Sequence, residues 1–138
     1  MQKEFVPYEL ALRMKQLGFD EPCFGFYDDI DDHHPLSFIR IEGLSEKLKS
    51  SITLAPTWQQ TFRWFRDEYK LFHEVFIDCE PRADVPLEED LMFSFTIHCV
   101  REDKFIVGSR NIYKTQEEAE LACLEKLIEI VEQKQKEK

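Results

Sequence analysis

Residues 28–34 hold the densest group of possible metal ligands in the sequence. They supply four carboxylates and two imidazoles within seven positions: Asp28, Asp29, Asp31, Asp32, His33 and His34. Hard cations bind carboxylate clusters, whereas histidine shifts the preference toward transition metals. The spacing lacks the glycine and terminal glutamate of an EF-hand loop, and it matches no zinc motif. Two interpretations stay open: a metal-binding or enzymatic centre and, favoured by default, a hydrated turn that shields an edge strand.

A basic strip on the helix predicted for residues 57–72 is the second candidate site. Its members recur at helical intervals on one face: Gln59, Arg63, Arg66 and Lys70. In a chain with 28 acidic and 18 basic residues, such a strip could hold phosphate groups or an acidic partner. Arg63 and Asp67, four residues apart, could equally form an ordinary ion pair on a solvated helix face. The strip is therefore a candidate for anion or partner binding, with simple solvation as the default.

Catalytic residues are not predicted anywhere in the chain. The four cysteines stand far apart without a CxxC pair, which is typical of buried thiols in a reducing compartment. His98 and Cys99 are adjacent in a predicted strand, so their side chains point to opposite faces and cannot share a hydrogen bond. Neither a GxSxG, a Walker-type loop, a GxGxxG nor an HExxH is present. We expect no enzymatic activity and no cofactor.

Composition narrows the range of partners. The formal net charge of −10 argues against broad binding to nucleic acid or to anionic membranes, which favour basic surfaces. A chain of 138 residues can bury a core without disulfides or metal, so one domain over 1–138 is expected. The sequence shows neither a signal-like segment nor an apolar run long enough to span a bilayer. We expect a cytoplasmic protein.

Two helices are the clearest elements, and each opens with a capping box, in which a threonine and a side chain three residues later satisfy unpaired N–H groups. Thr57 and Gln60 begin the first, whose aromatic rings form one stripe predicted to be buried: Trp58, Phe62, Phe65, Tyr69 and Phe72. Thr115 and Glu118 begin the second, over residues 115–133. Its apolar arc comprises Ala119, Leu121, Cys123, Leu124, Leu127, Ile128, Ile130 and Val131.

Strands are predicted by alternation at residues 74–80 and 91–101, with a third after a turn at 102–103. The segment 1–55 adds a helix from Pro7 to Leu17, capped by Gly18, and strands at 24–27 and 36–42, whereas 43–55 could be a helical turn or a loop. The order is α-β-β-α-β-β-β-α, with residues 57–133 forming an α-β-β-β-α unit. We predict an α+β fold with one antiparallel sheet of four to five strands and helices mainly on one face.

The turn at 102–103 also predicts an ion pair. A two-residue loop would pair Cys99 with Ile106 and would carry Arg110 onto the sheet face that the last helix covers. Glu120 lies in the middle of that helix's apolar arc, where a carboxylate needs water or a partner. We therefore predict a structural ion pair between Arg110 and Glu120.

From Thr57 onward, the order helix, three antiparallel strands, helix resembles the double-stranded-RNA-binding domain, and TQEEAELACLEKLIEIV looks like the last helix of that domain. The resemblance covers a little over half of the chain and implies the fold of that family. The family binds RNA phosphates with a lysine-rich start to this helix. Here the matching positions are Gln116, Glu117, Glu118 and Glu120. Negative charge at these positions would repel a phosphate backbone, so RNA binding is not implied.

Three stretches, FVPYELALRMKQLGFDEPCF, APTWQQTFRWFRDEYK and TQEEAELACLEKLIEIV, are similar to a family of short uncharacterised proteins from Bacteroidetes genomes and their prophages. The resemblance implies a small cytoplasmic accessory protein or regulator of phage or mobile-element origin. Together with the lack of catalytic patterns, it favours an interaction protein that binds an unknown protein partner. The alternatives are a nucleic-acid-binding module that uses the basic strip, and a metal-binding or enzymatic protein centred on Asp28–His34. The pattern does not specify an oligomeric state.

Overall fold

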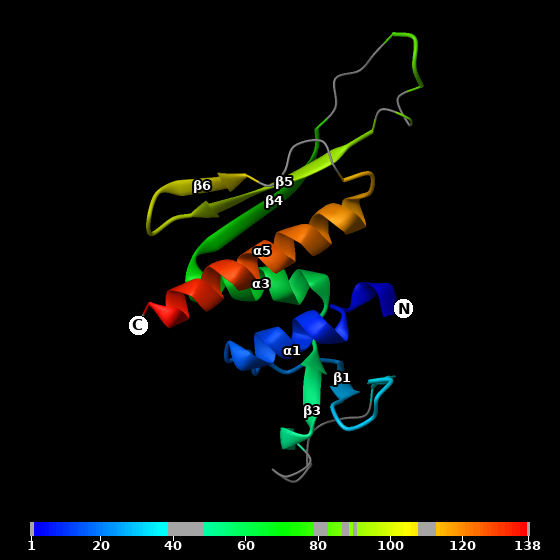
Figure 1. The fold of residues 1–138 in the computed structure, drawn as a ribbon, viewed down its shortest axis with the longest axis vertical. Helices are drawn as coiled ribbons and strands as arrows, with labels where there is room; N and C mark the ends of the chain where they lie inside the picture. The colour runs from blue at the N-terminus through cyan, green and yellow to red at the C-terminus, as the bar shows by residue number, and fades with distance from the viewer. Residues whose placement is uncertain are drawn as a thin grey trace. The chain divides into compact units, whose positions relative to one another are not determined.

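The computed structural model of the chain describes residues 2–38, 49–78, 83–86, 89, 91–107 and 113–137. The contacts group into two compact units, Met1–Thr61 and Phe62–Lys138, and the boundary falls within helix α3 (Trp58–Tyr69). The fold is α+β, and the order of its elements agrees with the prediction (Figure 1). The expectation of a single domain stays a prediction. Among the described residues, no helix is both long and apolar enough to span a membrane.

The strands form two antiparallel sheets of three strands each, so the predicted single sheet of four to five strands is wrong. In the first unit, β1 (Gly25–Asp28) pairs on one side with β2 (Leu36–Ser37) and on the other with β3 (Ile52–Ala55). Strand β3 lies in the segment for which only a helical turn or a loop was predicted. Because β3 takes the second edge of β1, these strands complete a sheet of their own. The rest of the predicted strand 36–42, from residue 39, lies outside the described residues.

Helix α1 (Tyr8–Gln16) follows a short 3-10 helix, η1 (Gln2–Glu4), and ends as predicted at a glycine. Gly18 has a φ of +102°, and the N–H of Phe19 donates to the carbonyl oxygen of Met14 at 3.0 Å. This is the left-handed termination that glycine adopts without a Cβ penalty. Met14 is fully buried, and the helix packs on β3.

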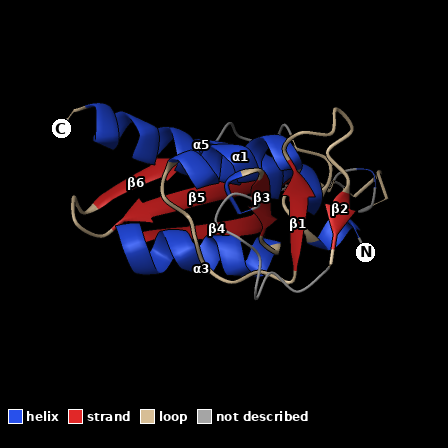
Figure 2. Ribbon diagram, turned by 90° about the horizontal axis from the view of Figure 1, so that it is seen from below, coloured by secondary structure: helices blue, strands red, loops and turns tan. Residues whose placement is uncertain are grey.

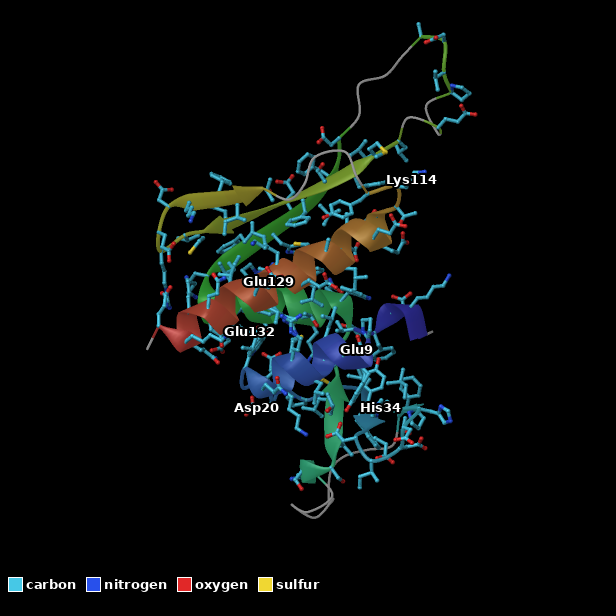
Figure 3. All side chains as sticks on the ribbon, viewed as in Figure 1. Glu9, Asp20, His34, Lys114, Glu129 and Glu132 are labelled. Atoms are coloured by element: carbon cyan, nitrogen blue, oxygen red, sulfur yellow. The ribbon has the colours of Figure 1, made fainter. Side chains whose placement is uncertain are left out.

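In the second unit, β4 (Leu71–Ile77), β5 (Phe93–Cys99) and β6 (Lys104–Val107) form a sheet in that order. Helix α5 (Gln116–Lys136) runs along this sheet (Figures 1 and 2). Its start confirms the threonine half of the capping box, because Thr115 Oγ1 accepts the N–H of Glu118 at 3.1 Å. The Glu118 carboxylate accepts the N–H of Lys114, labelled in Figure 3, at 3.2 Å.

The buried side of α5 is narrower than predicted. Its buried residues are Ala119, Cys123, Leu124, Leu127, Ile128 and Val131. Leu121 is 37 % exposed, and Ile130 is only half-buried. At 100° per residue Leu121 lies about 100° from the centre of the buried arc, so it stands at the margin of the arc, where side chains are partly exposed.

Helix α3 ends earlier than predicted. The N–H of Gln60 donates to Thr57 Oγ1 at 3.2 Å, which confirms the start, but the helix stops at Tyr69. Lys70 has a φ of +56°, and β4 begins at the next residue. Phe72 therefore belongs to the sheet and is 41 % exposed. Its assignment to the buried helical stripe is wrong, because the left-handed turn reverses the chain before it.

The hairpin register differs from the prediction by two residues. Cys99 pairs with Lys104 rather than with Ile106, so residues 100–103 form the turn. An even shift preserves the face on which each side chain lies, and Ile106 remains on the helix-covered side. Arg110 lies outside the described residues, so its ion pair with Glu120 stays a prediction. The Glu120 carboxylate accepts a hydrogen bond from the side chain of Gln116 at 2.9 Å.

Candidate functional site

The two faces of the β4-β5-β6 sheet have different surroundings. Ile97 and Cys99 are buried on one face, where the Lys134 ammonium of α5 donates to Cys99 Sγ at 3.6 Å. Helix α3 contacts the same face, because Phe62 stacks on His73, the cross-strand partner of Ile97, with ring centroids 3.7 Å apart. Both helices of this unit therefore cover one face of the sheet.

The other face, which we call the open face, carries the alternate side chains of the three strands. The members described are Phe72, Glu74, Phe76, Ser94, Thr96, His98 and Phe105. Ser94 is buried and donates to the Asp78 carboxylate at 2.8 Å. A row of three rings crosses this face, because Phe72 pairs with His98 and His98 pairs with Phe105. The imidazole stacks on Phe105, with centroids 4.2 Å apart and planes 8° apart.

This row exposes much of its aromatic surface. Phe105 is 66 % exposed and Phe72 is 41 % exposed. Single exposed apolar side chains are ordinary, but several adjacent ones on a flat surface mark a place where another molecule binds. The row is therefore the strongest candidate site in the second unit.

Several acidic side chains lie on or beside the open face. Glu74 lies in the middle of β4, and Asp78, directly after the strand, accepts the hydroxyl of Ser94 on this face at 2.8 Å. The side chain of Asp103 is 97 % exposed, and its Oδ1 lies 3.5 Å from Nε2 of His98. The basic residue described within the three strands, Lys104, shares the opposite face with Cys99. The open face thus combines aromatic surface with negative charge.

The predicted basic strip is divided by the end of α3. Gln59 and Arg63 are exposed on the helix, whereas Lys70 lies in the left-handed turn and donates to the carbonyl oxygen of Asp67 at 2.9 Å. Nε of Arg66 lies 3.9 Å from the Asp67 carboxylate. The ion pair of Asp67 is therefore with Arg66, whereas the sequence suggested a pair with Arg63. The four residues do not continue as one helical row, because Lys70 has left the helix.

Two of the four carboxylates of residues 28–34 bond within their own loop, which joins β1 to β2. Asp28 Oδ1 accepts the N–H of Ile30, and Asp31 Oδ1 accepts the N–H of His33, each at 2.9 Å. Such bonds from an aspartate to the backbone two residues on stabilise tight turns. They direct these oxygens toward the backbone of the loop.

Asp29 is the centre of a polar cluster that the sequence analysis did not identify. Its carboxylate accepts Nζ of Lys15 at 2.9 Å and Oγ1 of Thr53 at 2.6 Å, and Tyr8 donates at 3.3 Å. Burial acts to raise the pKa of Asp29, but the hydrogen bonds from Thr53 and Lys15 and the charge of Lys15 outweigh burial, and the pKa is lowered. Lys15 also donates to the carbonyl oxygen of Ile52 at 2.8 Å. The cluster therefore ties α1 to β1 and β3.

The remaining side chains of this turn point in different directions. Asp32 and His33 are exposed, and His34, labelled in Figure 3, stacks on Tyr8 with centroids 3.7 Å apart. Across the segments that the structure describes, no three or more His, Cys, Asp or Glu side chains gather where they could hold a metal ion. The metal or enzymatic hypothesis for Asp28–His34 therefore lacks a converging ligand set, and the geometry is that of a hydrogen-bonded turn.

The aromatic row escaped the sequence analysis because Phe72 also fits the helical spacing of α3. One local signal could have identified it: LFHEVFI, directly after Lys70, is rich in β-branched and aromatic residues, which favour strands. The pairing of Phe72, His98 and Phe105 depends on register, which no local pattern specifies.

A scan against protein-family models, a search of curated proteins and a search of solved structures each found no match to this chain.

Proposed function

We propose that this chain is an accessory protein that acts by binding a basic partner protein through the open face. The exposed row Phe72, His98 and Phe105 carries the proposal. Aromatic side chains that lie together on a rigid strand surface are the usual anchors of protein interfaces, because they bury a large apolar area at a low cost in conformational entropy.

The charges around the row indicate the chemistry of the partner. Glu74, Asp78 and Asp103 lie on or beside the open face, so lysine or arginine side chains on a partner would meet complementary charge. An arginine or lysine can also stack on the face of an exposed phenylalanine such as Phe105. A partner that combines basic and apolar residues fits this surface.

Nucleic acid fits the same surface less well. Bases could stack on Phe72 and Phe105, as they do on aromatic platforms of single-strand-binding proteins. The phosphates that accompany the bases would then lie beside Glu74 and Asp103, and a phosphate backbone binds where lysine and arginine neutralise it. The arrangement of charge therefore favours a protein partner.

Capture from cells of the source organism, followed by mass spectrometry, tests the proposal when it uses matched variants. The bait proteins are the wild-type chain, Phe105→Ser, and Phe24→Ser as the control, because Phe24 is 80 % exposed and lies in the first unit. A true partner is retained by the wild type and by Phe24→Ser and is lost by Phe105→Ser.

The captured partner is then purified and titrated against the three proteins. We expect Phe105→Ser to weaken binding by about 30-fold, the effect of losing one central anchor, and Phe24→Ser to bind as the wild type does. Equal capture and equal affinity for both variants would refute the open face as the binding surface. Binding of a fluorescein-labelled oligothymidine at low salt, at least as tight as that of the protein partner, would favour nucleic acid instead.

A further inference from the structure

The outer edge of β4 is the longest unpaired strand edge that the structure describes. Strand β4 has seven residues and stands at one end of the order β4-β5-β6, whereas the other described edge strands, β2, β3 and β6, have two, four and four. Proteins usually shield such edges with proline, lysine, a bulge or very short strands. The β4 sequence LFHEVFI contains neither proline nor lysine.

The hydrogen bonds at the two ends of the β4–β5 ladder show which backbone groups point outward. The N–H of Val100 donates to the carbonyl oxygen of Lys70 at 3.2 Å, and the N–H of Asp78 donates to that of Met92 at 2.8 Å. In an antiparallel pair, successive residues direct their backbone groups alternately toward and away from the partner strand. The even-numbered residues of β4 therefore bond to β5. The residues that direct N–H and C=O groups to the outer edge are Leu71, His73, Val75 and Ile77.

The side chains next to this edge specify what an added strand should carry. Phe72, Glu74 and Phe76 lie on the open face along β4, and side chains directly opposite on a neighbouring strand interact in pairs. Aromatic residues beside Phe72 and Phe76, and a lysine or arginine beside Glu74, would be complementary. We infer that the β4 edge accepts an extended segment of the partner with the pattern aromatic-x-basic-x-aromatic; this inference rests on the proposed function.

A second copy of the chain fits this edge less well. Antiparallel pairing of two β4 strands about their centre would place Phe72 of one copy opposite Phe76 of the other, but it would also place the two Glu74 side chains directly opposite each other. Like charges in that position destabilise a sheet. The central glutamate thus selects a different chain with a cation at its centre.

A fluorescein-labelled peptide, Thr-Phe-Thr-Lys-Thr-Phe-Thr, serves as the probe, because its pattern reads the same in both strand directions. Fluorescence anisotropy with the full chain measures its affinity, beside that of a second peptide in which glutamate replaces lysine. The wild type should bind the lysine peptide about fivefold more tightly than the glutamate peptide, and Glu74→Lys should reverse this preference. Glu125→Lys, the same charge change at an exposed position on α5, should leave the preference as in the wild type.

Amide hydrogen exchange reports on the backbone pairing directly. Saturating lysine peptide should slow exchange at the N–H groups of His73, Val75 and Ile77. A peptide with proline on both sides of its lysine should not bind, because it lacks the N–H donors that the ladder needs. Anisotropy unchanged up to about 1 mM peptide, or binding without protection of these three amides, would overturn strand addition.

Two further outcomes separate this inference from the proposed function. In the first outcome, partner capture depends on Phe105 but the purified partner leaves the three β4 amides unprotected. This outcome refutes strand addition and leaves the proposed function intact. Partner capture that is insensitive to Phe105→Ser refutes the proposed function. The three amides could also become protected without peptide, to an extent that grows with protein concentration. Together with a dimer in sedimentation, this would identify a second copy as the occupant of the edge and overturn the inference.

Discussion

Replacement of His73 by phenylalanine tests whether a neutral imidazole stabilises the second unit. The ring of His73 lies flat on Phe62, with centroids 3.7 Å apart and planes 12° apart. Burial, and then the charge of Arg66, lower the pKa of His73 from 6.5 to about 4. Phenylalanine can retain the ring stack while removing the group that titrates.

The sign of the effect follows from the lowered pKa. The unfolded chain binds a proton at His73 near pH 6.5, whereas the folded chain binds it only near pH 4. The stabilisation is therefore fully present above pH 6.5 and is lost as the pH falls from 6.5 toward 4. A histidine that binds its proton only in the unfolded chain would lower the free energy of unfolding by roughly 1.3 kcal/mol between about pH 7.5 and 5.5. Because His73 is only half-buried, solvent screening reduces this loss to about 1 kcal/mol.

Urea denaturation at about pH 7.5, 6.5 and 5.5 measures the effect while staying above the isoelectric point of 4.9. Trp64 is 5 % exposed and belongs to the second unit, so its fluorescence reports the unfolding of that unit in a Trp58→Phe background. Between about pH 7.5 and 5.5, the free energy of unfolding of Trp58→Phe should fall by about 1 kcal/mol more than that of the double variant Trp58→Phe, His73→Phe.

Parallel pH dependences would contradict a lowered pKa of His73 in the folded chain. If the free energies of unfolding with and without His73→Phe differ by the same amount at all three pH values, within about 0.3 kcal/mol, the folded state does not exclude the proton from His73. The same substitution at His33, which is exposed in the loop between β1 and β2, controls for the loss of one histidine.

Three further substitutions test the local structure, each by thermal and urea unfolding. Asp29→Asn removes the charge that Lys15 and Thr53 contact and should destabilise the first unit by about 1 to 2 kcal/mol, since the pair is partly solvated; an unchanged midpoint would contradict the role of the cluster. Gly18→Ala forces a Cβ into a φ of +102° and should cost about 1 kcal/mol, so equal stability would mean that the turn relaxes freely. Thr115→Ala removes the cap of α5 and should cost about 1 kcal/mol, whereas Thr115→Ser should cost little; equal losses for both would argue against the hydroxyl.

Local features of the fold could be predicted because each depends on residues within a few positions of one another. The caps at Thr57 and Thr115 and the glycine stop at Gly18 need only one turn of helix to form. The alternation of Phe95, Ile97 and Cys99 in the predicted strand 91–101 likewise indicates one buried face directly, and all three side chains are buried. From such signals the α+β class and the element order follow.

The candidate site could not be predicted, because it consists of pairings between distant segments. Phe72, His98 and Phe105 become neighbours only through the register of two strand pairs, and a shift of register is invisible to hydrophobic pattern when it preserves the face. The division into two sheets depends in the same way on β3, whose four residues carry too short a pattern to be recognised before they meet β1.

Residue types and their spacing are enough to predict where most of the helices and strands begin, which side of α5 is buried, and that the chain is acidic. Folding in three dimensions is needed to bring Asp29 to Lys15 rather than to its neighbours in the acidic turn. It is also needed to align the rings of β4, β5 and β6 on the sheet face opposite α3 and α5. The physical reason is that hydrogen bonds and ring contacts between segments tens of residues apart depend on chain reversals and strand register, and local sequence constrains both only weakly.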